Sequence, residues 1–164
     1  MLKRKIETYL ADWKQSQDRK PLVIKGIRQC GKTYIVQKFA RENYDSVVYM
    51  NFILNLSALI QGSRFIEGKT CIILDEIQEC KEARTALKSF HIDGRFDVIA
   101  TGSLLGVKGY GQSKKKKEDI GQDSIPVGYE TVIDMYPLDF EEFLWANGIS
   151  PAIIDSVKSC FENE

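Results

Sequence analysis

A short stretch near the start of the chain constrains the fold more than any other feature. Residues Gly26 to Thr33 read Gly-Ile-Arg-Gln-Cys-Gly-Lys-Thr, which matches G-x-x-x-x-G-K-[ST] at every fixed position. The apolar run 22–24 precedes it, and an amphipathic pattern over 35–40 follows it. Between a strand and a helix, the glycines let backbone N–H groups converge on phosphate, and the helix N-terminus adds its positive end. The stretch predicts a phosphate-binding loop; a glycine-rich turn with a solvated lysine is the alternative.

The residues of this loop have separate expected roles. Lys32 is expected to reach the β- and γ-phosphates of a nucleotide, and Thr33 to offer its hydroxyl to Mg²⁺. Arg28 would contact phosphate, act on a neighbouring molecule or form a surface ion pair. The expected nucleotide-binding residues are Gly26, Ile27, Arg28, Gln29, Cys30, Gly31, Lys32, Thr33 and Tyr34.

A second motif is an apolar run that ends in two carboxylates, Asp75 and Glu76. At the carboxyl end of a parallel strand, such side chains face the same crevice as a phosphate loop. Asp75 is then expected to hold Mg²⁺ through its water shell, and Glu76 to polarise an attacking water. A solvated strand end is the alternative.

A third element, Thr101-Gly102-Ser103, follows another apolar run. A hydroxyl there can lie between the second-motif carboxylates and the γ-phosphate, where some ATPases carry a sensor residue. Ser103 is slightly favoured over Thr101 for that role. A strand-ending turn that needs Gly102 is the alternative.

The hydrophobic pattern predicts strands alternating with helices, hence a parallel sheet covered on both faces, an α/β fold. Expected strands lie at 22–24, 46–52, 70–74, 96–100 and 131–136, with helices at 2–16, 34–42 and 83–90 and two more after 139. Ser150 and Pro151 are the natural start of the last helix. Residues 106–125, rich in Gly, Lys, Ser and Gln, predict a mobile surface loop.

Composition narrows the classes of function. Lysine plus arginine and aspartate plus glutamate number 23 each, so the whole chain has no electrostatic preference for nucleic acid or an anionic membrane. The run Lys114 to Lys117 leaves nucleic-acid binding as a minor alternative. The four cysteines form no C-x-x-C pair, which favours free thiols. No signal peptide or membrane span is evident, so a cytoplasmic location is expected.

Five ordered motifs give the chain a specific resemblance over about residues 1–148. It resembles the bacterial and archaeal AAA-type ATPases that carry a C-terminal domain of unknown function, the DUF4143 group. The motifs are Gly26 to Thr33, Ile73-Leu-Asp-Glu-Ile-Gln78, Ala100-Thr-Gly-Ser-Leu-Leu-Gly106, Pro126-Val-Gly128 and Met135-Tyr-Pro-Leu-Asp-Phe-Glu-Glu-Phe-Leu144.

This resemblance implies a three-layer P-loop fold with strand order 5-1-4-3-2 and Mg-ATP as ligand. It also implies Lys32 and Thr33 on phosphate and metal, Asp75 and Glu76 as metal holder and catalytic base, and Ser103 as sensor.

The chain departs from the family pattern in two places. Only 17 residues separate Phe52 from Thr70, which predicts that a helix flanking the sheet is shortened. After residue 148 the family continues into a helical lid, whereas here residues 149–164 would form only its start. No arginine follows Arg95. A lid arginine closing over the γ-phosphate is therefore missing, and slow hydrolysis is expected, since an arginine finger is worth about 10³–10⁵ in rate.

Two main functions follow as hypotheses. The first is an AAA-like ATPase domain that binds Mg-ATP and hydrolyses it weakly by water attack assisted by Glu76. The second is a catalytically impaired nucleotide-binding module that contacts a protein partner through its apolar C-terminal helix. A nucleic-acid-dependent ATPase and a gene fragment without an independent role are further alternatives.

Overall fold

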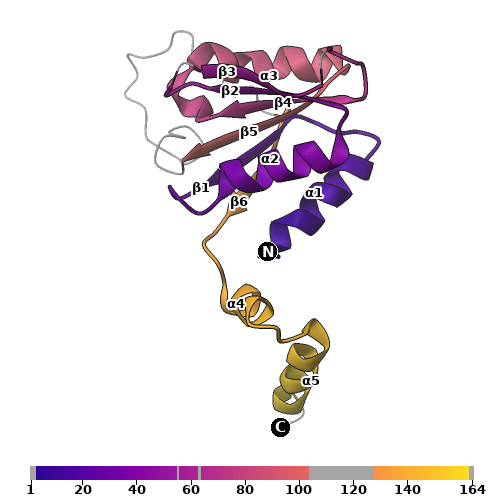
Figure 1. Ribbon diagram of the computed structural model, residues 1–164, viewed down its shortest axis with the longest axis vertical. Helices are drawn as coiled ribbons and strands as arrows, with labels where there is room; N and C mark the ends of the chain where they lie inside the picture. Colours follow the sequence, from indigo (N-terminus) through magenta and orange to yellow (C-terminus); the bar gives the residue numbers. More distant parts are fainter. Residues whose placement is uncertain (1–2, 55, 63, 104–127, 163–164) are drawn as a thin grey trace.

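A six-stranded sheet forms the centre of the protein (Figure 1). The computed structural model describes residues 3–54, 56–62, 64–103 and 128–162. The expected mobile loop at 106–125, with Lys114 to Lys117, lies entirely outside these residues. The strands are β1 (Leu22–Gly26), β2 (Ser46–Asn51), β3 (Leu56–Gln61), β4 (Thr70–Asp75), β5 (Asp97–Ser103) and β6 (Thr131–Met135).

The sheet has the order β3-β2-β4-β5-β1-β6. All neighbouring strands pair in parallel except β2 and β3, which are antiparallel. The five parallel strands follow the predicted order 5-1-4-3-2, and the α/β fold class is confirmed. The antiparallel edge strand β3 was not predicted. It occupies the short connection after Phe52, where a shortened helix was expected.

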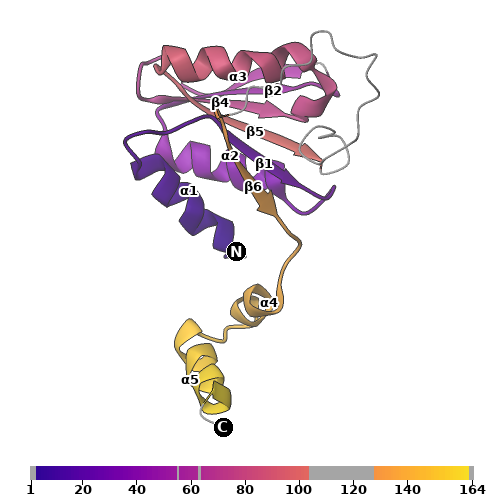
Figure 2. The same cartoon turned by 180° about the vertical axis from the view of Figure 1, so that it is seen from behind.

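Helices cover both faces of the sheet (Figures 1 and 2). The helices α1 (Lys5–Gln15) and α2 (Lys32–Asn43) lie on one face, and α3 (Lys81–Asp93) lies on the other. Two further helices, α4 (Phe140–Ala146) and α5 (Pro151–Glu162), follow β6. The predicted start of the last helix at Pro151 is confirmed. Helix α1 begins three residues later than predicted, at Lys5 instead of residue 2.

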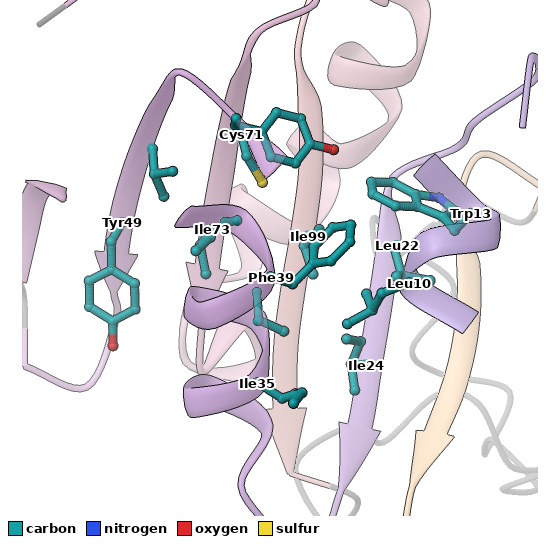
Figure 3. Close-up of a cluster of buried hydrophobic side chains, with 14 of the residues drawn as sticks. Leu10, Trp13, Leu22, Ile24, Ile35, Phe39, Tyr49, Cys71, Ile73 and Ile99 are labelled. Atoms are coloured by element: carbon teal, nitrogen blue, oxygen red, sulfur yellow. The ribbon is translucent and has the colours of Figure 1, made fainter. Parts of the chain in front are cut away.

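The alternation of side chains along the strands produces two hydrophobic cores. On β4, Cys71 and Ile73 face α1 and α2, whereas Ile72 and Leu74 face α3. The larger core, drawn in Figure 3, joins Leu10 and Trp13 of α1 to the apolar stripe of α2 and one face of the sheet. Because both faces of the central strands are buried, these strands are continuously apolar, as parallel strands usually are.

The segment after β6 leaves the body of the protein. Helices α4 and α5 project away from the sheet below α1 in Figure 1, and the reverse view in Figure 2 shows the same arrangement. Apart from Ile154, the residues of α5 whose side chains are described are exposed. We refer to residues 136–162 as the C-terminal arm. No helix in the described parts of the chain combines the length and the apolar character needed to cross a membrane.

Candidate functional site: a phosphate loop beside a buried carboxylate

The predicted site residues lie at one edge of the sheet, at the carboxyl ends of the parallel strands. Gly26 ends β1, Asp75 ends β4 and Ser103 ends β5. Strand β5 lies between the other two, and Gly26 is in register with Ser103. Parallel strands bring their carboxyl ends to one crevice, which is where ligands bind in open α/β sheets.

The loop from Gly26 to Thr33 bends sharply into α2. Gln29 and Gly31 have positive φ angles of 63° and 94°. This conformation costs little for glycine but is uncommon for glutamine. Helix α2 begins at Lys32, so its unpaired N–H groups lie at the loop. Residues 27–29 are exposed, whereas Cys30 and Lys32 are buried.

The first glycine of the loop is required by a close approach to β6. A Cβ atom added at Gly26 would lie 2.3 Å from the carbonyl oxygen of Met135. The Cys30 thiol also points to this carbonyl oxygen, with Sγ 3.7 Å away. The base of the loop is therefore packed directly on the end of β6.

The ammonium group of Lys32 points back into the loop. Its Nζ donates to the carbonyl oxygens of Gly26 at 3.0 Å and Ile27 at 2.7 Å, and the residue is only 6% exposed. The positive charge is thus held inside the curve of the loop, where it can stabilise an anion.

Asp75 is the most heavily hydrogen-bonded side chain of the site, and it is 2% exposed. Thr33 Oγ1 donates to its Oδ1 at 3.0 Å, Tyr49 Oη to its Oδ2 at 2.6 Å and Asn51 Nδ2 to its Oδ2 at 2.9 Å. The hydroxyl of Thr101 donates to Oδ1. Four donors from α2, β2 and β5 thus fix the carboxylate, which satisfies its buried oxygens.

The environment of Asp75 also shifts the pKa of Tyr49. Burial, followed by its hydrogen bond to Asp75, raises the pKa of the Tyr49 hydroxyl to about 12. The tyrosine therefore stays protonated at neutral pH and serves as a hydrogen-bond donor.

Glu76 follows Asp75 in a left-handed backbone conformation, with φ 57°. Gln78, in the short 3₁₀ helix Ile77–Glu79, donates from Nε2 to Glu76 Oε2 at 2.6 Å. The other end of this amide, Oε1, accepts from the backbone N–H of Ser103 at 3.3 Å. Gln78 therefore links the second carboxylate to the end of β5.

The structure brings most of the predicted site residues together, but they contact the site through different atoms. Thr33 and Asp75 are in direct contact, whereas Ser103 approaches the site through its backbone N–H and Thr101 through its hydroxyl. Tyr34 is 60% exposed on the first turn of α2. The roles of these residues remain predictions.

Sequence reasoning missed Tyr49, Asn51 and Gln78. The signal for the first two was present, because polar groups at alternate positions near the end of an apolar strand share one face. Gln78 carried no such periodic signal.

The donor set around Asp75 fits Mg²⁺. A threonine hydroxyl and a carboxylate, 3.0 Å apart, are hard oxygen ligands. Magnesium commonly binds through one or two carboxylates together with phosphate oxygens and water. Among the described residues no group of three or more His, Cys, Asp and Glu side chains is placed to hold a metal.

Comparison with known proteins identifies the family of the chain. A family model described as an AAA domain matches residues 18–144, which include the phosphate loop, both carboxylates and β6. This chain belongs to that AAA domain family. The match covers most of the chain, so the AAA domain is identified as an ATP-binding P-loop domain.

No protein with a curated description matches the AAA domain in sequence. Among solved structures, it is similar to a candidate ATPase from Cytophaga hutchinsonii ATCC 33406, with 16% identity and a TM-score of 0.45. That alignment covers 85% of this chain and 48% of the other. The AAA domain thus spans about half the length of that protein.

Proposed function

We propose that this AAA domain binds ATP together with Mg²⁺ and hydrolyses the nucleotide slowly. The observation that carries the proposal is the contact between Thr33 Oγ1 and Asp75 Oδ1, at 3.0 Å. It joins the last residue of the phosphate loop to a buried carboxylate from another strand. This pairing supports a shared role in holding a metal beside phosphate.

The residues of the loop would do most of the binding. Lys32 would exchange its contacts with the carbonyl oxygens of Gly26 and Ile27 for phosphate oxygens, which accept a charge-assisted hydrogen bond more strongly. The backbone N–H groups at residues 27–33 would supply the remaining donors, with Tyr34 on the rim. The carboxylate of Asp75 would be held in place by Tyr49, Asn51 and Thr101.

Bound Mg²⁺ would neutralise charge that develops on the phosphate oxygens. Glu76 would accept a hydrogen bond from the attacking water and draw away its proton. Its hydrogen bond with Gln78 would orient the carboxylate for this purpose, and Ser103 would act as the sensor at the end of β5.

Equilibrium binding of ATP, ADP and GTP in the presence of Mg²⁺ tests the binding step. We expect ATP binding that Lys32→Ala abolishes, because no other lysine reaches the curve of the loop among the described residues. Lys38→Ala is the matched control, since Lys38 lies on the same helix but pairs with Glu7. Unchanged ATP affinity in Lys32→Ala would overturn the assignment of the site.

Phosphate release tests the chemical step. Glu76→Gln keeps the size of the side chain and its contact with Gln78 but removes the base, so turnover should fall by about 10²–10⁴-fold, the usual contribution of a general base. Glu82→Gln, at an exposed glutamate on α3, is the control. Equal release by Glu76→Gln and the unaltered chain would show that the chain does not catalyse hydrolysis by itself.

That last outcome would favour the second candidate, a nucleotide-binding interaction module. The C-terminal arm supports it, because several large apolar side chains there are exposed: Phe140 by 75%, Phe143 by 52%, Ile153 by 56% and Val157 by 52%. Exposed apolar side chains gathered in one segment are typical of surfaces that contact a protein partner.

A further inference from the structure

Arg4, which precedes helix α1, contacts three segments that are distant in the sequence. Its Nη1 donates to the carbonyl oxygen of Cys30 in the phosphate loop at 3.2 Å. Its Nη2 donates to the carbonyl oxygen of Tyr136, just after β6, at 2.7 Å. Its Nε lies 3.1 Å from Glu142 Oε1 in α4. The Nε–H is not aligned for a hydrogen bond, so this last contact is an ion pair.

Glu142 is unusually enclosed for a glutamate on a short surface helix. The residue is 4% exposed, and the side chain of Arg4 is 13% exposed. Its Oε1 also accepts from the backbone N–H of Lys5 at 2.8 Å, and its Oε2 accepts from the backbone N–H of Asp139 at 3.1 Å. A carboxylate with these partners is fixed, and it fixes the guanidinium of Arg4 in turn.

The contact with Cys30 has a consequence for the neighbouring peptide N–H. In a trans peptide the C=O and N–H groups point in opposite directions. Because the carbonyl oxygen of Cys30 accepts from Arg4, the N–H of Gly31 in the same peptide points away from Arg4. The N–H groups of such a loop must turn inward together to bind phosphate.

We propose that the Arg4–Glu142 pair positions the phosphate loop for nucleotide and couples nucleotide binding to the docking of the C-terminal arm on α1. Arg4 touches no ligand in this scheme and acts through the peptide between Cys30 and Gly31. Because coupling between sites is reciprocal, nucleotide would strengthen arm docking to the same extent. The inference rests on the proposed nucleotide binding.

Lys5 provides a matched control for this inference. Its Nζ pairs with Asp139 and Glu141 of the same arm, each at 2.7 Å, and among the described residues none of its hydrogen bonds or ion pairs reaches the phosphate loop. Lys5→Gln therefore removes a positive charge at the junction of α1 and α4, as Arg4→Gln does, without releasing the loop.

The experiment measures ATP affinity for Arg4→Gln, Glu142→Gln and Lys5→Gln. Loop positioning predicts that both Arg4→Gln and Glu142→Gln weaken binding by about tenfold, within the usual range of coupling between sites, while Lys5→Gln stays within about twofold. If only the charge mattered, ATP affinity would change in opposite directions, with weaker binding in Arg4→Gln and tighter binding in Glu142→Gln. Changes of ATP affinity in opposite directions, or no change in either variant, would overturn the proposal.

A second measurement separates this result from failure of the proposed function. The backbone amide resonances of Gln29 to Gly31 are recorded without nucleotide for the same variants. Arg4→Gln and Glu142→Gln should shift the Gly31 amide, while Lys5→Gln should leave it in place. If the unaltered chain binds no ATP, the proposed function fails, and an unshifted Gly31 amide then refutes the positioning role as well.

Discussion

The residue that organises the site is Asp75, although a buried carboxylate is costly unless its oxygens are satisfied. Four side chains donate to it, and three of them, Tyr49, Asn51 and Thr101, come from the neighbouring strands β2 and β5. The sheet therefore fixes the carboxylate before any ligand is present. Preorganised groups of this kind lower the cost of ordering a site on binding.

Tyr49→Phe tests this account at the level of a single atom. The change removes one hydroxyl that donates to Asp75 at 2.6 Å and leaves the ring in the core. Because a buried acceptor loses a partner, we expect the free energy of unfolding to fall by about 1–3 kcal/mol, as measured by urea denaturation. Tyr9→Phe, at a residue that is 38% exposed, should change it by less than about 0.5 kcal/mol. Equal effects of the two changes would contradict the account.

The elements of the fold show how far the sequence could be interpreted. The runs at 22–24 and 70–74 are continuously apolar because both faces of β1 and β4 are buried, and this property made them recognisable. β3 was missed although Ala58-Leu59-Ile60 is apolar, because the short connection after Phe52 was interpreted as a shortened helix and short apolar runs do not distinguish helix from strand. The predicted position of the phosphate loop between a strand and a helix is confirmed. It could be predicted because its glycines and Lys32 lie close together in the sequence.

The contacts missed by sequence reasoning are those that join distant segments. Arg4 and Glu142 are 138 positions apart, and periodicity along a single element carries no information about such a pair. Tyr49 and Asn51 could be assigned to one face of a strand, but their shared partner Asp75 depends on the register between β2 and β4. The choice between Thr101 and Ser103 depended in the same way on the register of β5.

Helix α3 offers a prediction at the scale of an element. Leu87 is fully buried against the sheet, whereas Ile92 on the same helix is 70% exposed. Leu87→Ala should therefore lower the free energy of unfolding by about 2–5 kcal/mol, because it removes buried methyl groups and leaves a cavity. Ile92→Ala should stay within about 0.5 kcal/mol, because the site is at the surface. Thermal or urea unfolding of both variants measures the difference, and a similar loss in each would mean that α3 packs through another face.

At the scale of the whole molecule, the two ends of the parallel strands differ in chemistry. The carboxyl ends of the strands carry the phosphate loop and its carboxylates. Near the amino ends, Asp97 at the start of β5 pairs with Arg19 at 2.9 Å and accepts from Tyr44 Oη at 2.7 Å. Tyr44 and Cys71 belong to the larger core, so this end of the molecule holds ionisable groups that the proposed function does not use.

Those groups predict a loss of stability at alkaline pH. Burial is the main cause that raises the pKa of Tyr44 and of Cys71, from ordinary values of 10.0 and 9.0. Above about pH 9 the unfolded chain releases protons that the folded chain retains, so unfolding becomes more favourable as the pH rises. Below the ordinary pKa of each group, its full contribution to the free energy of unfolding is present. Above that pKa, each group lowers the free energy of unfolding by at most about 1.4 kcal/mol per pH unit.

Urea denaturation between pH 8 and about pH 11 measures this slope. Tyr44→Phe combined with Cys71→Ala will also lower stability at neutral pH, because the hydrogen bond to Asp97 and core volume are lost. The informative quantity is therefore the change of the free energy of unfolding with pH, which should be shallower in the double variant. Cys160→Ala, at an exposed thiol, should leave the slope unchanged. The same slope in all three proteins would show that these two buried groups do not control alkaline unfolding, and that other groups of the fold do.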